Sequence, residues 1–485
     1  MSIDISDKLD EVNFPHPTSS TSASFQPPKN FQGKTTNLFS TPREHSIRSG
    51  LWRTQKLALL LCVILISACI AQNLLPLSTF VIGVSIIVFC QILFRLFAAI
   101  IAIISPPTTL HTDSRLPPNL PKFTLLIPLY KEEAVAQSSV EAMKALNYPL
   151  DKLEVFYLLE PDDSPTQLAV QKAIRNTNFK ILIAPDTGPK TKPKALNYGL
   201  QYATGDIVSV FDAEDTPHPY QLLEVAHQYA QNDKNLAVVQ APLHAYNGNE
   251  SWIAAQFDLE YAIHFDVWLP AIAKLGWPMP LGGTSNHFDR RILQNVGAWD
   301  EYNVTEDADL GFRLARNGYK AQMISLPTLE EAPVRFSQWL PQRTRWIKGH
   351  IQTLMVLTRF PTQAIRALGL WKCLGITITF ISAIFAAGIH GPFLIYLLSN
   401  IFLGNIDIGQ PQNLLILSSY ISVALTAIPS KAWKDRKLTL LTTPLYWPLM
   451  SLAFFKAIWE LKSCPHSWSK TPHGVSKIEL ANLTP

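Results

Sequence analysis

Long apolar runs on both sides of a polar middle region constrain the fold of this 485-residue chain more than any other feature. Two runs, residues 57–75 and 77–104, come before the middle region, and three runs, residues 374–403, 414–428 and 438–461, follow it. About 20 apolar residues in a helix cover the roughly 30 Å hydrocarbon core of a bilayer. Charged residues are 16% of the chain, below the roughly 25% that is usual in soluble domains. We therefore expect transmembrane helices in the lipid bilayer at both ends and a soluble domain between them.

The segments between these runs predict how the chain is divided and oriented. Basic residues before the first run favour a cytoplasmic N-terminus, and a hairpin would return the chain to the cytoplasm. Pro444 and Pro448 interrupt the last run, so this segment either crosses the membrane or re-enters it, and the side of the C-terminal tail stays open. The predicted divisions are a disordered N-terminal tail (1–50), a transmembrane hairpin (51–105), a cytosolic domain (106–365), C-terminal transmembrane helices (366–461) and a C-terminal tail (462–485).

The middle region has the pattern of an α/β domain. Short apolar segments at residues 123–130, 153–159 and 207–211 end in polar loops and alternate with helical patterns. Such alternation indicates a mostly parallel sheet, and open sheets of this kind bind ligands at the carboxyl ends of their strands. The net charge of +4 is too small to favour nucleic acid as a partner. The loops that follow the strands are therefore the expected place of the functional site.

Three acidic clusters follow apolar segments: residues 160–163 (EPDD), residues 212–215 (DAED), and Glu306 with Asp307. Each alone could be a solvated turn or a helix cap, and Thr305 could cap a helix that starts at residue 306. Together they fit sugar transfer from a nucleotide-diphosphate donor. In that reaction carboxylates hold a divalent cation against the leaving diphosphate, and a separate carboxylate takes the proton of the acceptor hydroxyl.

A basic segment fits the same chemistry. Lys190, Lys192 and Lys194 stand on a proline-rich loop before a helix, and a helix start is a favourable place for phosphate. A solvated loop explains Lys190 and Lys192 equally well. Lys194, next to the helix start, is the stronger candidate for a phosphate contact.

The ordered segments LIPLYKEE, EPDD, TKPKALNYGL, FDAED, LGGTSNHF, VTEDADLGFRLARNGY and QRTRW resemble the inverting family 2 glycosyltransferases of membrane polysaccharide synthases. Cellulose and hyaluronan synthases are familiar members. The segments FDAED and GGTSNHF are similar to those of a bacterial subgroup whose products are β-glucan-like or otherwise diverse. The resemblance covers residues 120–350 and the flanking apolar runs. It implies a GT-A fold, a Rossmann-like α/β domain that binds nucleotide-diphosphate sugars, combined with transmembrane helices.

The resemblance also implies a role for each matching residue. Asp307 would be the catalytic base, and Asp212 with Glu214 or Asp215 would hold Mg²⁺ or Mn²⁺. His287 could reach metal or phosphate, although a structural histidine explains it as well. Trp346 would stack on an acceptor sugar, or it only anchors a helix at the membrane surface. The nucleotide-sugar group would comprise Pro128, Tyr130, Glu132, Glu160, Asp162, Asp163 and Lys194; the acceptor and diphosphate group would comprise Gly283, Thr284, Glu306, Gln342, Arg345 and Trp346.

The expected protein is thus a multi-pass enzyme of a bacterial inner membrane with a cytoplasmic catalytic domain. It would transfer a sugar from a nucleotide-diphosphate donor, with UDP as the expected nucleotide, to a growing β-linked polysaccharide. Membrane helices beside the domain suggest processive synthesis coupled to export, with accessory export subunits as further partners. Two alternatives stay open: single glycosylation of a lipid carrier, and a catalytically silent scaffold that binds sugar nucleotides.

Overall fold

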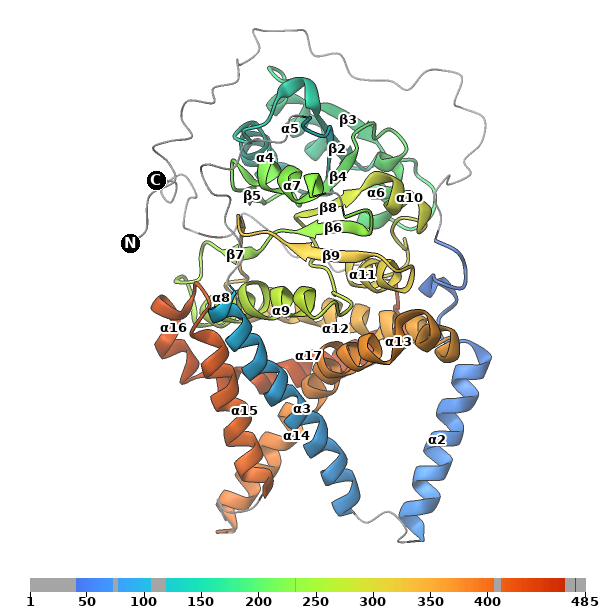
Figure 1. Ribbon diagram of the computed structural model, residues 1–485, viewed down its shortest axis with the longest axis vertical. Coiled ribbons are helices and arrows are strands. Elements are labelled where there is room, and N and C mark those ends of the chain that lie inside the picture. Colours follow the sequence, from blue (N-terminus) through green and yellow to red (C-terminus); the bar gives the residue numbers. More distant parts are fainter. Residues whose placement is uncertain are drawn as a thin grey trace.

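The computed structural model describes residues 41–72, 77–105, 119–231, 233–404 and 411–466, together with residue 476. Figure 1 shows an α/β domain above a layer of helices, from which further helices project away from the domain. Most of the predicted N-terminal and C-terminal tails lies outside the described residues.

A seven-stranded sheet forms the centre of the domain, in the order β3-β2-β1-β4-β8-β6-β9. Its strands are β1 (Phe123–Leu129), β2 (Leu153–Leu159), β3 (Lys180–Ile183), β4 (Ile207–Val210), β6 (Leu236–Gln240), β8 (Asn286–Asp289) and β9 (Lys320–Met323). Strands β1 to β4 pair in parallel, whereas β8 runs antiparallel to both β4 and β6. The α/β prediction is confirmed, and the sheet is mixed because β8 separates the two parallel parts.

The register of the parallel strands brings the predicted acidic clusters to one edge. Phe123 of β1 pairs with Leu153 of β2 and Ile207 of β4, so the three strands start and end together. A smaller sheet lies beside this edge, and it consists of β5 (Thr216–Pro217), β7 (Leu243–Ala245) and β10 (Thr328–Glu330).

Helices cover both faces of the large sheet. One apolar cluster includes Val140 and Val225, and the other includes Leu196 and Leu310. The helices of the domain are η3 (Glu133–Val135), α4 (Ala136–Lys144), η4 (Leu150–Lys152), α5 (Ser164–Ala173), α6 (Lys192–Leu200), α7 (Gln221–Ala230), α10 (Arg290–Asn295) and α11 (Glu306–Arg316).

A layer of helices lies under the domain in Figure 1. It consists of α8 (Trp252–Ile263), the π-helix η5 (His264–Trp268), α9 (Leu269–Lys274), α12 (Phe336–Leu357) and α13 (Pro361–Ile376). Helix α13 buries Ala364 and Leu368 but exposes Leu370 and Trp371, the pattern of a helix that lies on an apolar surface.

The helices that project from this layer are α2 (Arg53–Ala71), α3 (Leu77–Ile104), η6 (Thr377–Ile381), α14 (Ser382–Phe402), α15 (Pro411–Ala427), α16 (Trp433–Leu440) and α17 (Thr443–Ser463). By length and composition, two stretches of the described chain could cross a membrane, Ser85–Ile104 and Pro361–Phe402. A third is possible if α16 and α17 count together, although they are bent by 80°.

The last ten residues of the predicted disordered tail pack on the domain, which corrects that boundary for residues 41–50. Arg359 donates hydrogen bonds to the carbonyl oxygens of Ser46 and Gly50, and Ser46 donates to Asp300. Ile47 is buried. This segment is therefore ordered by contacts with distant residues that its polar composition does not reveal.

The residues after α17 contact α12 and the α/β domain. Lys348 of α12 donates to the carbonyl oxygen of Cys464, and Gln352 donates to that of Pro465. His466 lies 2.9 Å from the carbonyl oxygen of Tyr302 in the domain. These contacts favour a re-entrant last segment over one that crosses the membrane fully.

Candidate active site

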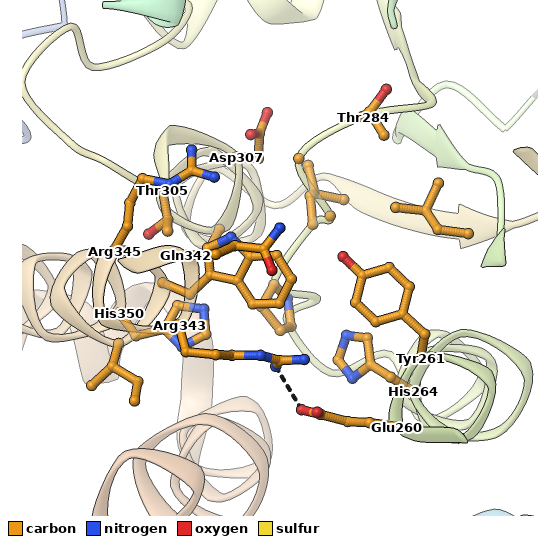
Figure 2. Close-up of a pocket in the computed structure, with 18 of the residues that line it drawn as sticks. Glu260, Tyr261, His264, Thr284, Thr305, Asp307, Gln342, Arg343, Arg345 and His350 are labelled. Carbon is orange, nitrogen blue, oxygen red and sulfur yellow. Dashed lines mark hydrogen bonds and ion pairs between the residues drawn. The ribbon is translucent and has the colours of Figure 1, made fainter. Parts of the chain in front are cut away.

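A cavity of about 490 Å³ lies between the carboxyl edge of the sheet and the helical layer, and it continues among α3, α14 and α17. Figure 2 shows part of it, with Asp307 and Arg345 on one side, Tyr261 and His264 on the other, and Gln342 between them. Thirteen of the predicted site residues line this cavity: Pro128, Tyr130, Glu132, Glu160, Asp212, Glu214, Gly283, Thr284, Glu306, Asp307, Gln342, Arg345 and Trp346. The described structure places the other four predicted residues outside that lining.

Two of those four belong to the EPDD turn. Asp163 is the N-cap of α5 and accepts hydrogen bonds from the backbone N–H groups of Thr166 and Lys131. Asp162 is exposed and forms an ion pair of 2.8 Å with Lys190, and this contact lowers the pKa of Asp162. Asp163 therefore holds the turn, while Glu160 presents the cluster's carboxylate to the cavity.

The side chain of Lys194 is buried under the cavity wall. Its Nζ lies 2.9 Å from Glu160 Oε2 and also donates to the carbonyl oxygen of Pro185. The ion pair fixes the position of the Glu160 side chain at the cavity wall. Lys194 thus supports a cavity residue rather than facing the ligand space itself.

Lys192 lines the cavity, although the sequence did not distinguish between a ligand contact and a solvated loop for this residue. Its Nζ lies 2.6 Å from Asp212 Oδ1 and 2.5 Å from the carbonyl oxygen of Gly283. Burial alone would lower the pKa of Lys192, but Asp212, Asp307 and Glu306 together raise it. Lys192 is therefore a permanent cation between the two acidic clusters, where a diphosphate would be attracted.

The DAED turn divides its carboxylates between structure and cavity. Asp215 is 1% exposed, and its Oδ2 accepts from the backbone N–H of Asp212 at 2.7 Å and from the hydroxyl of Thr284. Asp212 and Glu214 line the cavity. The geometry therefore favours Asp212 and Glu214 over Asp215 as candidate metal ligands.

These residues fit a divalent cation that also binds the substrate. Among the described residues, no group of three or more Asp, Glu, His or Cys side chains could hold a metal by itself. Mg²⁺ is commonly bound through one or two carboxylates, with substrate phosphates completing its coordination. The pair formed by Asp212 and Glu214 matches that donor set.

The first turn of α11 carries the predicted base. Glu306 and Asp307 are 5% and 4% exposed, and Asp307 Oδ1 is buried without a hydrogen-bond partner. Burial, and then the charge of Glu306, raises the pKa of Asp307 well above that of an ordinary aspartate. A buried acceptor oxygen at the wall of the cavity is suited to receive a proton from a hydroxyl group.

We predict that the pH dependence of activity follows Asp307. Only the ionised carboxylate can act as a base, so kcat/KM should fall as the pH is lowered through the raised pKa of Asp307. A bound cation should favour the ionised form, so the acid limb of kcat should lie at lower pH than that of kcat/KM. Rate measurements between pH 4 and pH 9, at about one pH unit intervals, test this. A flat profile down to pH 4 contradicts the assignment.

The acceptor end of the cavity contains an aromatic cage that the sequence reading did not include. The guanidinium carbon of Arg343 lies 4.5 Å from the ring centroid of Trp346 and 5.0 Å from that of Phe257. Arg343 also forms an ion pair of 2.8 Å with Glu260, drawn as a dashed line in Figure 2. Trp346 stacks on Tyr261 with centroids 6.0 Å apart. Arg343 and Tyr261 thus fix the orientation of the indole.

Glu330 was also missed. Glu330 is the last residue of β10 and lines the cavity, where burial, and then the charge of Glu214, raises its pKa to about 8. The segment TLEEAP that contains it carries no motif, so the sequence offered no signal for it. His287, in contrast, is fully buried in β8 with its Nδ1 2.7 Å from Ser209 Oγ, which supports the structural interpretation.

A glycine in α12 allows close packing against the residue that precedes Glu306. A Cβ atom added at Gly349 would fall within 3.0 Å of three side-chain atoms of Thr305. We predict that Gly349→Val displaces the start of α11 and lowers the melting temperature and the activity together, with a loss of about 1–3 kcal/mol in stability. Gly83→Val is the control, because nothing lies within 4 Å of that position and Gly83 lies in the helix α3 (Leu77–Ile104), with no positive φ. Equal melting temperatures for Gly349→Val and the parent protein would contradict this packing role.

Comparisons with known proteins agree with this geometry. Residues 120–349 match the family described as glycosyltransferase like family 2. A β-monoglucosyldiacylglycerol synthase of Trichormus variabilis is 27% identical over 247 residues, which are 50% of this chain and 52% of that protein. The cellulose synthase 1 catalytic subunit of Komagataeibacter xylinus is 24% identical over 282 residues, 54% of this chain and 35% of that protein.

A solved structure shows the same fold. The mannosyltransferase PcManGT from Pyrobaculum calidifontis, in complex with GDP-Man and Mn²⁺, superposes with a TM-score of 0.51 at 18% identity and covers 79% of this chain and 98% of its own. The chain spans about half or less of the length of the curated relatives named above. The α/β domain therefore has a GT-A-like fold, and residues 120–349, slightly less than half of the chain, match the glycosyltransferase like family 2.

Proposed function

We propose that this protein is an inverting membrane glycosyltransferase that uses a nucleotide-diphosphate sugar. The observation that carries the proposal is that two acidic groups line one cavity with a lysine between them. Asp212 and Glu214 form one group, the buried Asp307 lies near Gly283 with Glu306, and Lys192 interacts with both groups. In-line attack of an acceptor hydroxyl, deprotonated by Asp307, would convert an α-linked donor into a β-linked product.

A divalent cation, Mg²⁺ or Mn²⁺, would be held by Asp212 and Glu214. When bound, it would neutralise the charge that develops on the leaving diphosphate. Lys192 is placed to support the same charge, and Arg345 is a second cation of the lining. Tyr130 and Glu160 would contact the nucleoside. UDP is the proposed nucleotide, although the structural relative PcManGT carries GDP-Man and Mn²⁺, so both nucleotides belong in a donor screen.

The proposed acceptor is a growing polysaccharide that leaves the site through the membrane helices. The cavity continues from Asp307 past Trp346 to side chains of α3, η5, α14 and α17, among them Trp268 of η5 and Trp447 of α17. Aromatic rings bind sugars by stacking, so this lining suits a chain of sugars. Processive synthesis, export and any accessory export subunits belong to this proposal, as does a multi-pass location in a bacterial inner membrane with the domain in the cytoplasm.

A second candidate function is a single sugar transfer to a lipid. Ile384 and Ala387 of α14 line the same cavity, so an acyl chain could occupy its lower part. The relative in Trichormus variabilis is named for a glycolipid product. Incubation of the purified protein in lipid with labelled donor separates the two functions by product size. A product that lengthens with time supports the polysaccharide, and a single-sugar lipid of constant size supports the second function.

We predict that Trp346→Ala damages product formation more than donor binding. The indole would hold the terminal acceptor sugar, and its loss should lower the rate by well over tenfold because reacting groups are no longer positioned. The nucleotide affinity should stay within about threefold, since this residue lies at the acceptor end. Trp339→Phe is a matched control in the same helix, because Trp339 is fully buried and hydrogen-bonded to Tyr446. Normal product length at a normal rate would exclude the acceptor role.

A further inference from the structure

The charged residues of the cavity are segregated. Carboxylates such as Asp212 and Asp307 line its upper part, at the edge of the sheet. The part among the lower helices is lined by Arg95, and its carboxylate Glu260 is already paired with Arg343. The lower part therefore carries a positive charge that sugar transfer at Asp307 does not use.

Arg95 is half-buried on α3, inside the candidate membrane span Ser85–Ile104. Its three recorded hydrogen bonds all run from Nη1, to the hydroxyl and carbonyl oxygens of Ser419 and to the hydroxyl of Ser422 on α15. Among the described residues, it forms no ion pair with a carboxylate. A charged side chain in a membrane segment is costly when its partners are neutral, and such residues commonly serve a ligand.

A second donor lies beside Arg95. The guanidinium carbon is 5.7 Å from the ring centroid of Trp268, at the end of η5. The indole Nε1–H of Trp268 is buried and has no hydrogen-bond partner in the described structure. Both side chains line the cavity. A guanidinium and an orphaned N–H group together form a donor set for a compact, multivalent oxyanion.

The position of Arg95 and Trp268 relative to the helical layer indicates which kind of molecule carries the anion. Contact with Trp268 places the Arg95 guanidinium against the layer of α8, η5 and α9, which lies between the domain and the projecting helices (Figure 1). Leu93 and Phe97, the neighbours of Arg95 on α3, are 50% and 44% exposed, as expected for side chains that face lipid. Helix α3 has 28 residues, more than the roughly 20 that cross a bilayer core, so a span that begins at Leu77 ends near Arg95. With that placement, the phosphate groups of a bilayer leaflet would lie at the level of the Arg95 guanidinium.

We propose that Arg95 and Trp268 bind the phosphate group of a lipid that enters the lower part of the cavity. The guanidinium donates to two phosphate oxygens, the indole N–H donates to a third, and the acyl chains lie against α3 and α14. The site does not depend on the sugar-transfer reaction, because its residues are separate from the carboxylates and from Lys192. A lipid at this position would fill the space next to Trp346 and restrict which acceptors can reach Asp307.

The test measures how strongly the purified full-length protein retains phosphatidylglycerol relative to diacylglycerol, which has the same acyl chains but no phosphate group. Binding is counted by native mass spectrometry, without donor or metal, after dilution into detergent. We expect a preference of about tenfold for phosphatidylglycerol, which falls to near unity in Arg95→Gln and is partly kept in Arg95→Lys. Trp268→Phe keeps the ring and removes the N–H group, so it should weaken the preference without disturbing the packing.

Arg366→Gln is the matched control, because Arg366 is an exposed cation on α13 and attracts anionic lipid only through the surface. A preference that persists in both Arg95→Gln and Trp268→Phe, or that is lost in Arg366→Gln, overturns the proposal. Full displacement of the lipid by 10 mM inorganic phosphate also overturns it, since the site would then serve a soluble anion. Nucleotide binding by the same preparations shows whether the catalytic domain is folded, so failure here is distinct from failure of the proposed transferase function.

Discussion

Replacement of Asp307 by asparagine should abolish sugar transfer while leaving donor binding nearly intact. The amide has almost the same shape as the carboxylate but cannot accept a proton, and loss of a general base typically costs about 10²–10⁴-fold in rate. The effect should fall on kcat, because Asp307 contacts the acceptor side of the cavity, near Gly283. Steady-state rates and nucleotide affinity on one preparation measure both quantities.

Asp309→Asn is the control for the neighbouring position. Asp309 stands in the same first turn of α11, but its carboxylate pairs with Arg313 at 3.0 Å and is buried away from the ligand space. Its replacement should lower stability more than it changes the rate of the folded fraction. If Asp307→Asn kept more than about half of the parent activity, the assignment of the base would be wrong.

Replacement of Asp212 by alanine should remove metal-dependent donor binding, and with it about 10²–10³-fold in activity, because a bound cation supplies several kcal/mol of charge stabilisation. Glu214→Ala should have a similar effect if both carboxylates hold the cation. EDTA should reproduce the loss in the parent protein, and added Mn²⁺ or Mg²⁺ should restore activity.

Asp215→Asn separates metal binding from the structure of the turn. Asp215 Oδ2 accepts hydrogen bonds from the Asp212 backbone and the Thr284 hydroxyl, and an amide oxygen can still accept them. This variant should therefore keep most of its response to metal. Donor affinity that is the same with and without EDTA in the parent protein would count against a cation at Asp212.

The order of the sheet could not be read from the sequence. The apolar segments that became β1, β2 and β4 were predictable, because buried parallel strands are apolar throughout. The antiparallel position of β8 between β4 and β6 depends on contacts between residues far apart in the chain. The strand ends that position Asp212 were therefore predictable, but the neighbour that brings Thr284 to them was not.

The site residues divide in the same way. Asp307 and Trp346 belong to motifs, and both line the cavity. The directions of the lysine side chains at the start of α6 could not be predicted from the sequence. Lys194 was the expected phosphate contact, but it pairs with Glu160, and Lys192 reaches the cavity beside Asp212. Arg343 is the second residue of the QRTRW segment, and no feature of the sequence indicated a role for it. Its guanidinium lies over the Trp346 ring, and this contact shows that it orients the indole.

Nucleotide release by the purified protein in lipid tests the central claim most directly. A panel of UDP- and GDP-sugars is supplied with Mn²⁺ and an acceptor extract, and the parent protein is compared with Asp307→Asn. We predict release from at least one donor by the parent protein, loss of release with EDTA, and nucleotide binding without release in Asp307→Asn. Nucleotide binding without release from any donor by the parent protein, or equal release by Asp307→Asn, would contradict the account and indicate a catalytically silent scaffold or a different base.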